Sequence, residues 1–284
     1  MYPLYKCLPS RFSTILLLPF IFMLSCDGGT FEVPAPEEFT KKNREKLGEL
    51  LQNAISENNL YQILPNHPPY DTTVYWYIRE LYNQATLSMR LDNLSPSNDR
   101  WNQNRDWNIQ VVLDENSAFA FTLPGGDFYI STGFLKLFEE DFELYYVLSF
   151  ESLLMNEGNL LTRLIEEYNS LTLVNIIQGK ATANNISAKI IAEELPELTY
   201  ETSLVRDLDS KTVKEICKTS VFERQGIILL LNEYNEFQVD WLRTRETYET
   251  RAQDIPFYST EAGLVCGDIR NTGKYKQYVL DFLP

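Results

Sequence analysis

The chain has 284 residues, of which 40 are acidic and 25 are basic, and its formal net charge is −15. A hydrophobic fraction of 44% is too high for a disordered chain, and the length suffices for one or two domains with a sizeable core. The acidic balance argues against a nucleic-acid partner, which needs a basic surface to displace counterions. His67 is the only histidine, so the chain by itself cannot build a metal site from two or three imidazoles.

The N-terminus has the pattern of a secretory signal. Lys6 and Arg11 precede an apolar run over residues 13–24, which Pro19 interrupts. At about 1.5 Å per residue in a helix, this run is shorter than the ~30 Å hydrocarbon core of a bilayer. The segment therefore predicts a signal peptide rather than a membrane-spanning helix.

The next four residues, Met23-Leu24-Ser25-Cys26, resemble the lipobox of bacterial lipoproteins. This resemblance implies that residues 1–25 are removed and that Cys26 carries lipid. It also implies a protein anchored to the membrane of the cell envelope and facing the periplasm or the surface, since more than one acyl chain gives durable anchoring. Residues 26–38 are rich in proline, glycine and acidic side chains and predict a tether. We expect residues 39–284 to form a single domain.

The patterns that follow predict helices and a few strands. Apolar residues spaced three and four apart predict helices from Thr40 and over 75–89, separated by a proline-containing turn at 66–71 and followed by a polar loop at 93–106. Strands are predicted at 107–113, 119–123 and 128–130, with Pro124–Asp127 as a turn. Helical patterns return over 133–168, 183–195, 203–217 and 220–237. This order predicts an α+β domain in which helices dominate.

The segment NSAFAFTLPGGDFYISTGFL (116–135), together with the run from Glu143 to Leu154, resembles one family. These are the zinc metalloendopeptidases that include the HtpX heat-shock protease, the CAAX prenyl protease and the BepA-type periplasmic lipoproteins. Members carry a similar glycine-containing segment just before a helix with a His-Glu-x-x-His motif. The resemblance extends more weakly over 40–215. It implies a zincin-like metallopeptidase fold with a small sheet next to the active-site helix.

The positions that match the family's zinc ligands have lost their histidines. Phe150 stands at the first ligand position, Leu154 at the second, and Asp207 matches a glutamate on a later helix. The chemistry needs two imidazoles four residues apart on one helical face. Glu151, at the position of the general base, is retained. We therefore expect no bound cofactor, although zinc is the metal of the family.

The surroundings of Glu151 leave several possibilities open. Leu144, Val147 and Leu148 share its helix, and an ionised carboxylate on an apolar face would cost several kcal/mol without a partner. Glu151 is therefore paired with a base such as Arg163 or Arg206, or protonated, or open to water in a remaining cleft. The simplest alternative is an ordinary polar residue on a partly exposed helix.

The predicted strand containing Ala118, Phe119, Ala120 and Phe121 is a candidate for peptide binding. The resemblance implies that this edge strand holds an extended polypeptide through main-chain hydrogen bonds. An ordinary sheet strand is the alternative. His67 lies in the proline-containing turn, which is typical of a surface residue. Cys217 and Cys266 are either a disulfide or two buried thiols, and the sequence does not choose between them.

These observations predict a non-catalytic lipoprotein that binds an extended polypeptide or a partner protein of the cell envelope. Two alternatives remain. One is an active zinc metalloendopeptidase with rearranged ligands, and the other is a purely structural lipoprotein whose cleft is filled.

Overall fold

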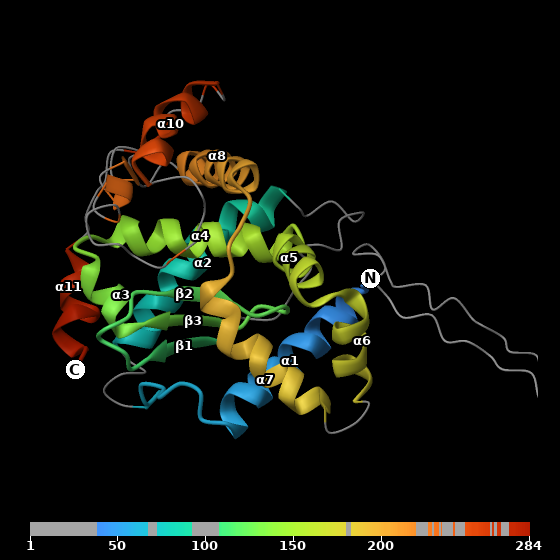
Figure 1. The fold of residues 1–284 in the computed structure, drawn as a ribbon. Helices are drawn as coiled ribbons and strands as arrows, with labels where there is room; N and C mark the ends of the chain where they lie inside the picture. Colours follow the sequence, from blue (N-terminus) through green and yellow to red (C-terminus); the bar gives the residue numbers. More distant parts are fainter. Residues whose placement is uncertain are drawn as a thin grey trace, which may run out of the picture. The chain divides into compact units, whose positions relative to one another are not determined.

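Most of the described chain is helical, and a small sheet lies among the helices (Figure 1). The computed structural model describes residues 39–67, 73–92, 108–179 and 183–219, and parts of 227–284. The predicted dominance of helices in an α+β fold is confirmed. The predicted signal peptide (1–25), Cys26, the tether (26–38) and the predicted loop (93–106) lie outside the described residues.

The sheet has three strands in the order β1-β3-β2. β1 (Ile109–Val112) runs parallel to β3 (Phe128–Ser131), whereas β2 (Ala120–Thr122) is antiparallel to it. All three were predicted, although β1 and β2 are shorter than the alternating patterns. β2 is therefore an edge strand of this sheet.

The turn between β2 and β3 depends on close packing against a helix. Gly125 has φ of +100°, which glycine adopts without steric cost. The turn lies against Gly48 of α1, where an added Cβ would stand 1.6 Å from the carbonyl oxygen of Pro124. The absence of a side chain at Gly48 thus lets α1 approach the turn at Pro124 closely.

The helices surround the sheet and one another. Their bounds, in chain order, are α1 (Lys41–Glu57), α2 (Val74–Asp92), α3 (Thr132–Leu137), α4 (Asp141–Asn156), α5 (Asn159–Tyr168), α6 (Ser170–Gln178), α7 (Ala183–Glu194), the 3₁₀ helix η3 (Leu195–Glu197), α8 (Thr202–Thr219), α10 (Tyr248–Glu261), α11 (Lys274–Tyr278) and the 3₁₀ helix η4 (Leu280–Phe282).

The helix that carries Glu151, α4, is buried along its whole length. It begins where the side chain of Glu143 accepts hydrogen bonds from the backbone N–H groups of Glu139 and Glu140. α2, α5 and α8 pack around α4, and β2 lies against it. A helix that is largely apolar on every side is stable only in such surroundings. Because α4 is packed on all these sides, Glu151 is buried in the interior.

The helical pattern over 133–168 does not form one helix. Extended backbone at Phe138 and Glu140 separates α3 from α4, and Gly158, at φ of +81°, separates α4 from α5. The predictions did not include α6, α10 or α11. α10 contains Pro256. A proline in the sequence usually predicts the end of a helix, but α10 continues through this one.

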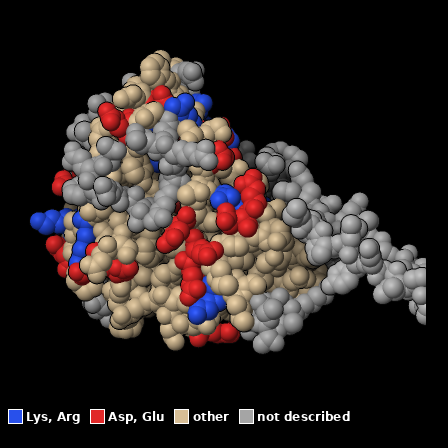
Figure 2. Space-filling model, viewed as in Figure 1, with Lys and Arg blue, Asp and Glu red and all other residues tan. Residues whose placement is uncertain are grey.

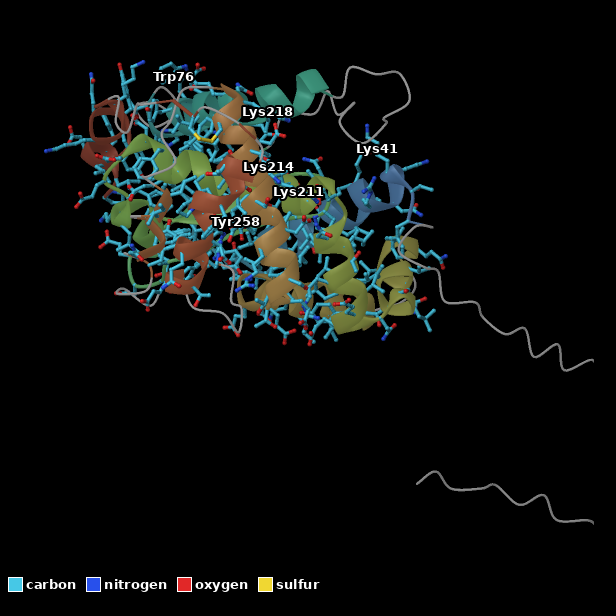
Figure 3. All side chains as sticks on the ribbon, turned by 90° about the horizontal axis from the view of Figure 1, so that it is seen from above. Lys41, Trp76, Lys211, Lys214, Lys218 and Tyr258 are labelled. Atoms are coloured by element: carbon cyan, nitrogen blue, oxygen red, sulfur yellow. A yellow bond between two sulfur atoms is a disulfide. The ribbon has the colours of Figure 1, made fainter. Side chains whose placement is uncertain are left out.

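The question left open for the two cysteines is answered. Cys217 at the end of α8 forms a disulfide with Cys266, 49 positions later in the chain (Figure 3). In the ranges that the structure describes, no helix is long and apolar enough to cross a membrane. The described residues, from Phe39 on, belong to one compact unit.

Candidate functional site

Glu151 is held by two hydrogen bonds from distant parts of the chain. Its Oε2 accepts a bond of 2.7 Å from the hydroxyl of Thr122 on β2, and its Oε1 accepts one of 2.9 Å from the indole nitrogen of Trp241. Only 1% of its surface is exposed, so it is not an ordinary polar residue on a partly exposed helix. Both carboxylate oxygens are engaged within the protein.

The carboxyl group of Glu151 has no cationic partner within the described residues. Arg163 donates to the carbonyl of Thr199 and forms an ion pair with Glu167, and Arg206 lies 3.4 Å from Asp254. Burial raises the pKa of Glu151 from 4.5 to about 7, although the two hydrogen bonds oppose this rise. Near neutral pH the group is therefore divided between its protonated and ionised forms.

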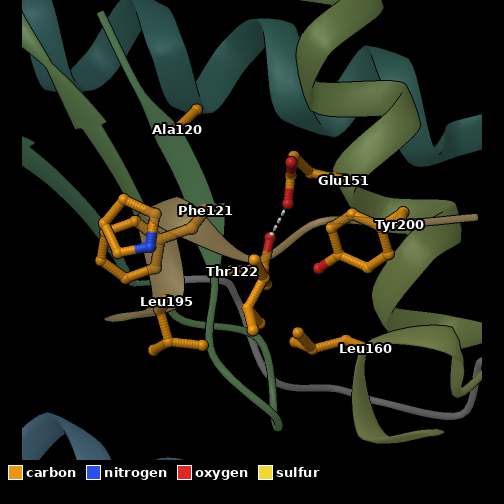
Figure 4. A pocket seen from close by; sticks show the side chains of 9 residues that line it. Ala120, Phe121, Thr122, Glu151, Leu160, Leu195 and Tyr200 are labelled. Carbon is orange, nitrogen blue, oxygen red and sulfur yellow. Dashed lines mark hydrogen bonds between the residues drawn. The ribbon is translucent and has the colours of Figure 1, made fainter. Parts of the chain in front are cut away.

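A small hollow lies beside Glu151, between β2, α4 and the segment Leu195–Tyr200, which we call the cover segment (Figure 4). Its cavity volume of about 10 Å³ is room for roughly one water molecule. Six of the nine residues that line it are apolar, and the full lining is Ala120, Phe121, Thr122, Glu151, Leu160, Leu195, Pro196, Leu198 and Tyr200.

Tyr200 is the third polar residue of this hollow, besides Glu151 and Thr122. It is 9% exposed, and its hydroxyl points into the hollow (Figure 4). Within the described part of the chain, this hydroxyl makes no hydrogen bond. Burial, followed by the nearby charge of Glu151, raises the pKa of the Tyr200 hydroxyl well above its usual value, so it stays protonated near neutral pH. A hydroxyl that lines a hollow and has no hydrogen-bond partner is a candidate contact for a ligand.

The outer edge of β2 offers unpaired backbone groups next to the hollow. Ser131 N–H donates to the Phe119 carbonyl, and Leu123 N–H donates to the Asp127 carbonyl. Because pairing alternates along an antiparallel strand, Ala120 and Thr122 direct their N–H and C=O groups away from β3. No backbone hydrogen bond from another described residue reaches these groups.

The predicted peptide-binding residues are mostly buried in this state. Phe119, Ala120 and Phe121 are each 5–7% exposed, and Ala118 is half-buried. The cover segment contacts β2 through η3. An extended polypeptide can therefore pair with β2 only after η3 moves away from the strand.

The structure packs Phe150 and Leu154 as core residues. They are 0% and 2% exposed. The ring of Phe150 lies edge-on to Trp241 at 5.5 Å, and the guanidinium of Arg251 lies 5.8 Å from its centre. Carbon therefore fills the positions where the family has zinc-binding nitrogen atoms.

Asp207, the third position matched to a ligand, faces away from these residues. Its side chain is 54% exposed and forms an ion pair of 2.6 Å with Lys211, on the side of α8 where Lys214 and Lys218 also lie (Figure 3). His67 is exposed and lies before α2. The structure does not bring either residue to Phe150 and Leu154.

A buried ion pair near Phe150 was missed by the sequence reasoning. Arg251 donates to both carboxylate oxygens of Asp209 at 2.8 and 2.9 Å, and the hydroxyl of Tyr146 also bonds to Asp209. The helical phase of α8 was the available signal, because Asp209 shares a face with the buried Val205 and Leu208, whereas Asp207 does not. No local pattern marked Thr122, Tyr200 or Trp241 as partners of Glu151.

The residues present do not fit a zinc ion. Among the described residues, no three histidine, cysteine, aspartate or glutamate side chains converge to hold a metal. Phe150 and Leu154 carry no donor atoms, and Glu151 already accepts two hydrogen bonds.

The chain matches no known protein family in a scan against family models, and it matches no curated protein. The resemblance to zinc metalloendopeptidases therefore depends on the motif residues alone.

Acidic side chains gather over α5, α7 and the cover segment (Figure 2). The exposed acidic residues there are Glu166, Glu167, Glu193, Glu194 and Glu197, and the exposed Glu201 follows the cover segment. The basic residues among them are Arg163 and Lys189. This surface therefore carries an excess of negative charge.

Proposed function

We propose that this protein is a lipid-anchored lipoprotein of the cell envelope that holds an extended polypeptide, or a segment of a partner protein, along the outer edge of β2. The observation that carries this proposal is the set of backbone groups at Ala120 and Thr122, beside the hollow, that no other described residue pairs with. An unpaired strand edge can accept a further strand, and main-chain hydrogen bonds then supply the affinity.

The proposal includes a zincin-like scaffold that has lost its reaction. Its basis is the resemblance over residues 116–154 and the position of Glu151 on a helix that packs beside the sheet. Peptide hydrolysis in that family needs a metal-bound water, whereas Phe150 and Leu154 supply no ligand atom. We infer that binding, rather than cleavage, is what the scaffold retains.

A specific observation also favours a second candidate function. The cover segment lies against β2, and the hollow has room for about one water molecule. A purely structural lipoprotein with a closed cleft is therefore the alternative. It differs from the first candidate in one respect, namely whether η3 leaves β2 when a polypeptide is present.

Peptide binding to the full-length lipidated protein in detergent micelles tests the proposal. Extended, fluorescently labelled peptides are titrated and compared with versions that are N-methylated at alternate backbone positions. We expect binding to be lost when methylation blocks the N–H groups that pair with β2, and to be kept when the intervening positions are methylated. If no peptide binds, or if methylation in either register has the same effect, strand addition is wrong and the structural alternative stands.

Two further measurements address catalysis and anchoring. We expect the purified protein to contain no stoichiometric zinc and to leave casein intact. Chelator-sensitive cleavage of casein would show that the alternative of an active endopeptidase is correct. For the anchor, we expect Cys26→Ser to abolish incorporation of labelled fatty acid and to move the protein out of the membrane fraction.

A further inference from the structure

The hollow beside Glu151 has the size and chemistry of a subsite for one particular side chain. We propose that it takes the ε-ammonium group of a lysine in the polypeptide that pairs with β2. This inference depends on the proposed function, because the peptide backbone must first lie along the strand. It adds the chemical class of the ligand, an extended segment that contains lysine.

The register of β2 places a peptide side chain at the hollow. Ala120 and Thr122 point their side chains to the α4 side of the sheet, where Thr122 reaches Glu151, whereas Phe121 points to the other side and stacks on Tyr129 at 4.9 Å. Residues of an added strand alternate in the same way. A residue that pairs opposite Ala120 or Thr122 therefore faces α4 and the hollow.

The acceptors in the hollow match an ammonium group. The hydroxyl oxygen of Tyr200 has no partner among the described residues, and each carboxylate oxygen of Glu151 keeps a lone pair after accepting one hydrogen bond. Lysine brings three donors and no acceptor. The ammonium would pair with the ionised carboxylate of Glu151, which has no cationic partner among the residues that the structure describes.

Size favours lysine over arginine. With η3 in place, the cavity of about 10 Å³ accepts a group of the size of water, and an ammonium group is of that size. A guanidinium group is planar and wider, and it carries five donors in a rigid arrangement. The apolar side chains of Leu160 and Leu198, which lie outside η3, form walls against which the methylene groups of lysine can pack.

The charge around the hollow also favours a basic segment. The exposed glutamates of α5, α7 and the cover segment outnumber Arg163 and Lys189 in the same region (Figure 2). A concentration of one sign of charge at an entrance raises the local concentration of oppositely charged ligands. Basic polypeptides would therefore reach β2 faster at low salt.

The test compares peptides that differ at one position. The full-length protein in micelles is titrated with an extended peptide that carries lysine, norleucine, arginine or acetyl-lysine at the residue facing α4, and with butylammonium alone. We expect the lysine peptide to bind about tenfold more tightly than the other three, as a buried charge-assisted hydrogen bond allows. Glu151→Gln and Tyr200→Phe should remove most of this preference, with melting temperatures measured to confirm folding. Tyr168→Phe, outside the hollow, is the matched control and should keep it.

The possible outcomes separate this inference from the proposed function. Equal affinity for all four peptides would show that the lysine subsite is wrong while strand addition stands. Absence of binding by every peptide would overturn both. Binding of butylammonium as tight as that of the lysine peptide would mean that the ligand is a free amine, and the assignment to a polypeptide would be wrong.

Discussion

The indole nitrogen of Trp241 donates a 2.9 Å hydrogen bond to Glu151, which lies 90 positions earlier in the chain. The bond brings a C-terminal segment onto the central helix α4, while Thr122 holds the other carboxylate oxygen from the sheet. One buried carboxyl group therefore links three parts of the fold. Its protonation affects the stability of all three.

The first prediction concerns pH. Burial raises the pKa of Glu151 from 4.5 to about 7, so the folded protein binds more protons than the unfolded chain between these values. The contribution of Glu151 to the free energy of unfolding should therefore be largest below about pH 4.5. This contribution should fall by about 3 kcal/mol as the pH rises from there through 7. Urea unfolding from pH 5 to 8 measures this fall.

Glu151→Gln is the variant that isolates this effect. The neutral amide should remove the fall that Glu151 causes, so the unfolding free energies of the variant should depend less on pH than those of the wild type. Glu57→Gln, at an exposed position of α1, is the control and should leave the profile unchanged. The same pH dependence in Glu151→Gln and the wild type would contradict the prediction.

The second prediction concerns the buried ion pair. Asp209 and Arg251 are 0% and 1% exposed. Asp209→Asn leaves the charge of Arg251 buried without a counterion, and we expect the free energy of unfolding to fall by about 3–5 kcal/mol. Glu49→Gln breaks the exposed pair with Lys46 and should cost less than about 1 kcal/mol. Chemical denaturation measures both losses of unfolding free energy. Similar losses in the two variants would show that burial of the Asp209–Arg251 pair matters less than the structure indicates.

The third prediction concerns the contact between α1 and the hairpin. Alanine usually stabilises the interior of a helix relative to glycine by about 1 kcal/mol. Gly48→Ala should instead destabilise the protein by about 1–3 kcal/mol, because the new methyl group would overlap the Pro124 carbonyl. Asn53→Ala, on the exposed side of the same helix, is the matched control and should have little effect. Thermal unfolding of both variants measures these changes in stability. A Gly48→Ala variant that is more stable than the wild type would contradict the close approach of α1 to the turn.

The fourth prediction concerns the disulfide. The Cys217–Cys266 bond closes a loop between positions 49 residues apart, and reducing it should lower the free energy of unfolding by about 4 kcal/mol through the added entropy of the unfolded chain. Denaturation with and without reductant measures the difference. The double variant Cys217→Ala/Cys266→Ala should not respond to reductant. An unfolding curve of the wild type that is also unchanged by reductant would contradict the bond.

Local patterns in the sequence predicted the elements around the site. The three-four spacing within α1 and the alternation of β2 and β3 depend on neighbouring residues, and both predictions are confirmed. The helical pattern from 133 to 168 did not predict where one helix ends and the next begins. Gly158 and the extended residues before α4 divide it, since caps and left-handed positions depend on how the neighbouring helices pack.

The sequence by itself determined that Phe150 and Leu154 cannot supply imidazole ligands, and it determined the carboxyl group at position 151. Only the tertiary structure decided what surrounds that group: Thr122 and Trp241 donate to it, and Tyr200 faces the hollow beside it. The physical reason is separation along the chain. Periodicity and turn chemistry act over a few residues, whereas these contacts join side chains 29 and 90 positions from Glu151, and their meeting depends on the packing of the whole fold.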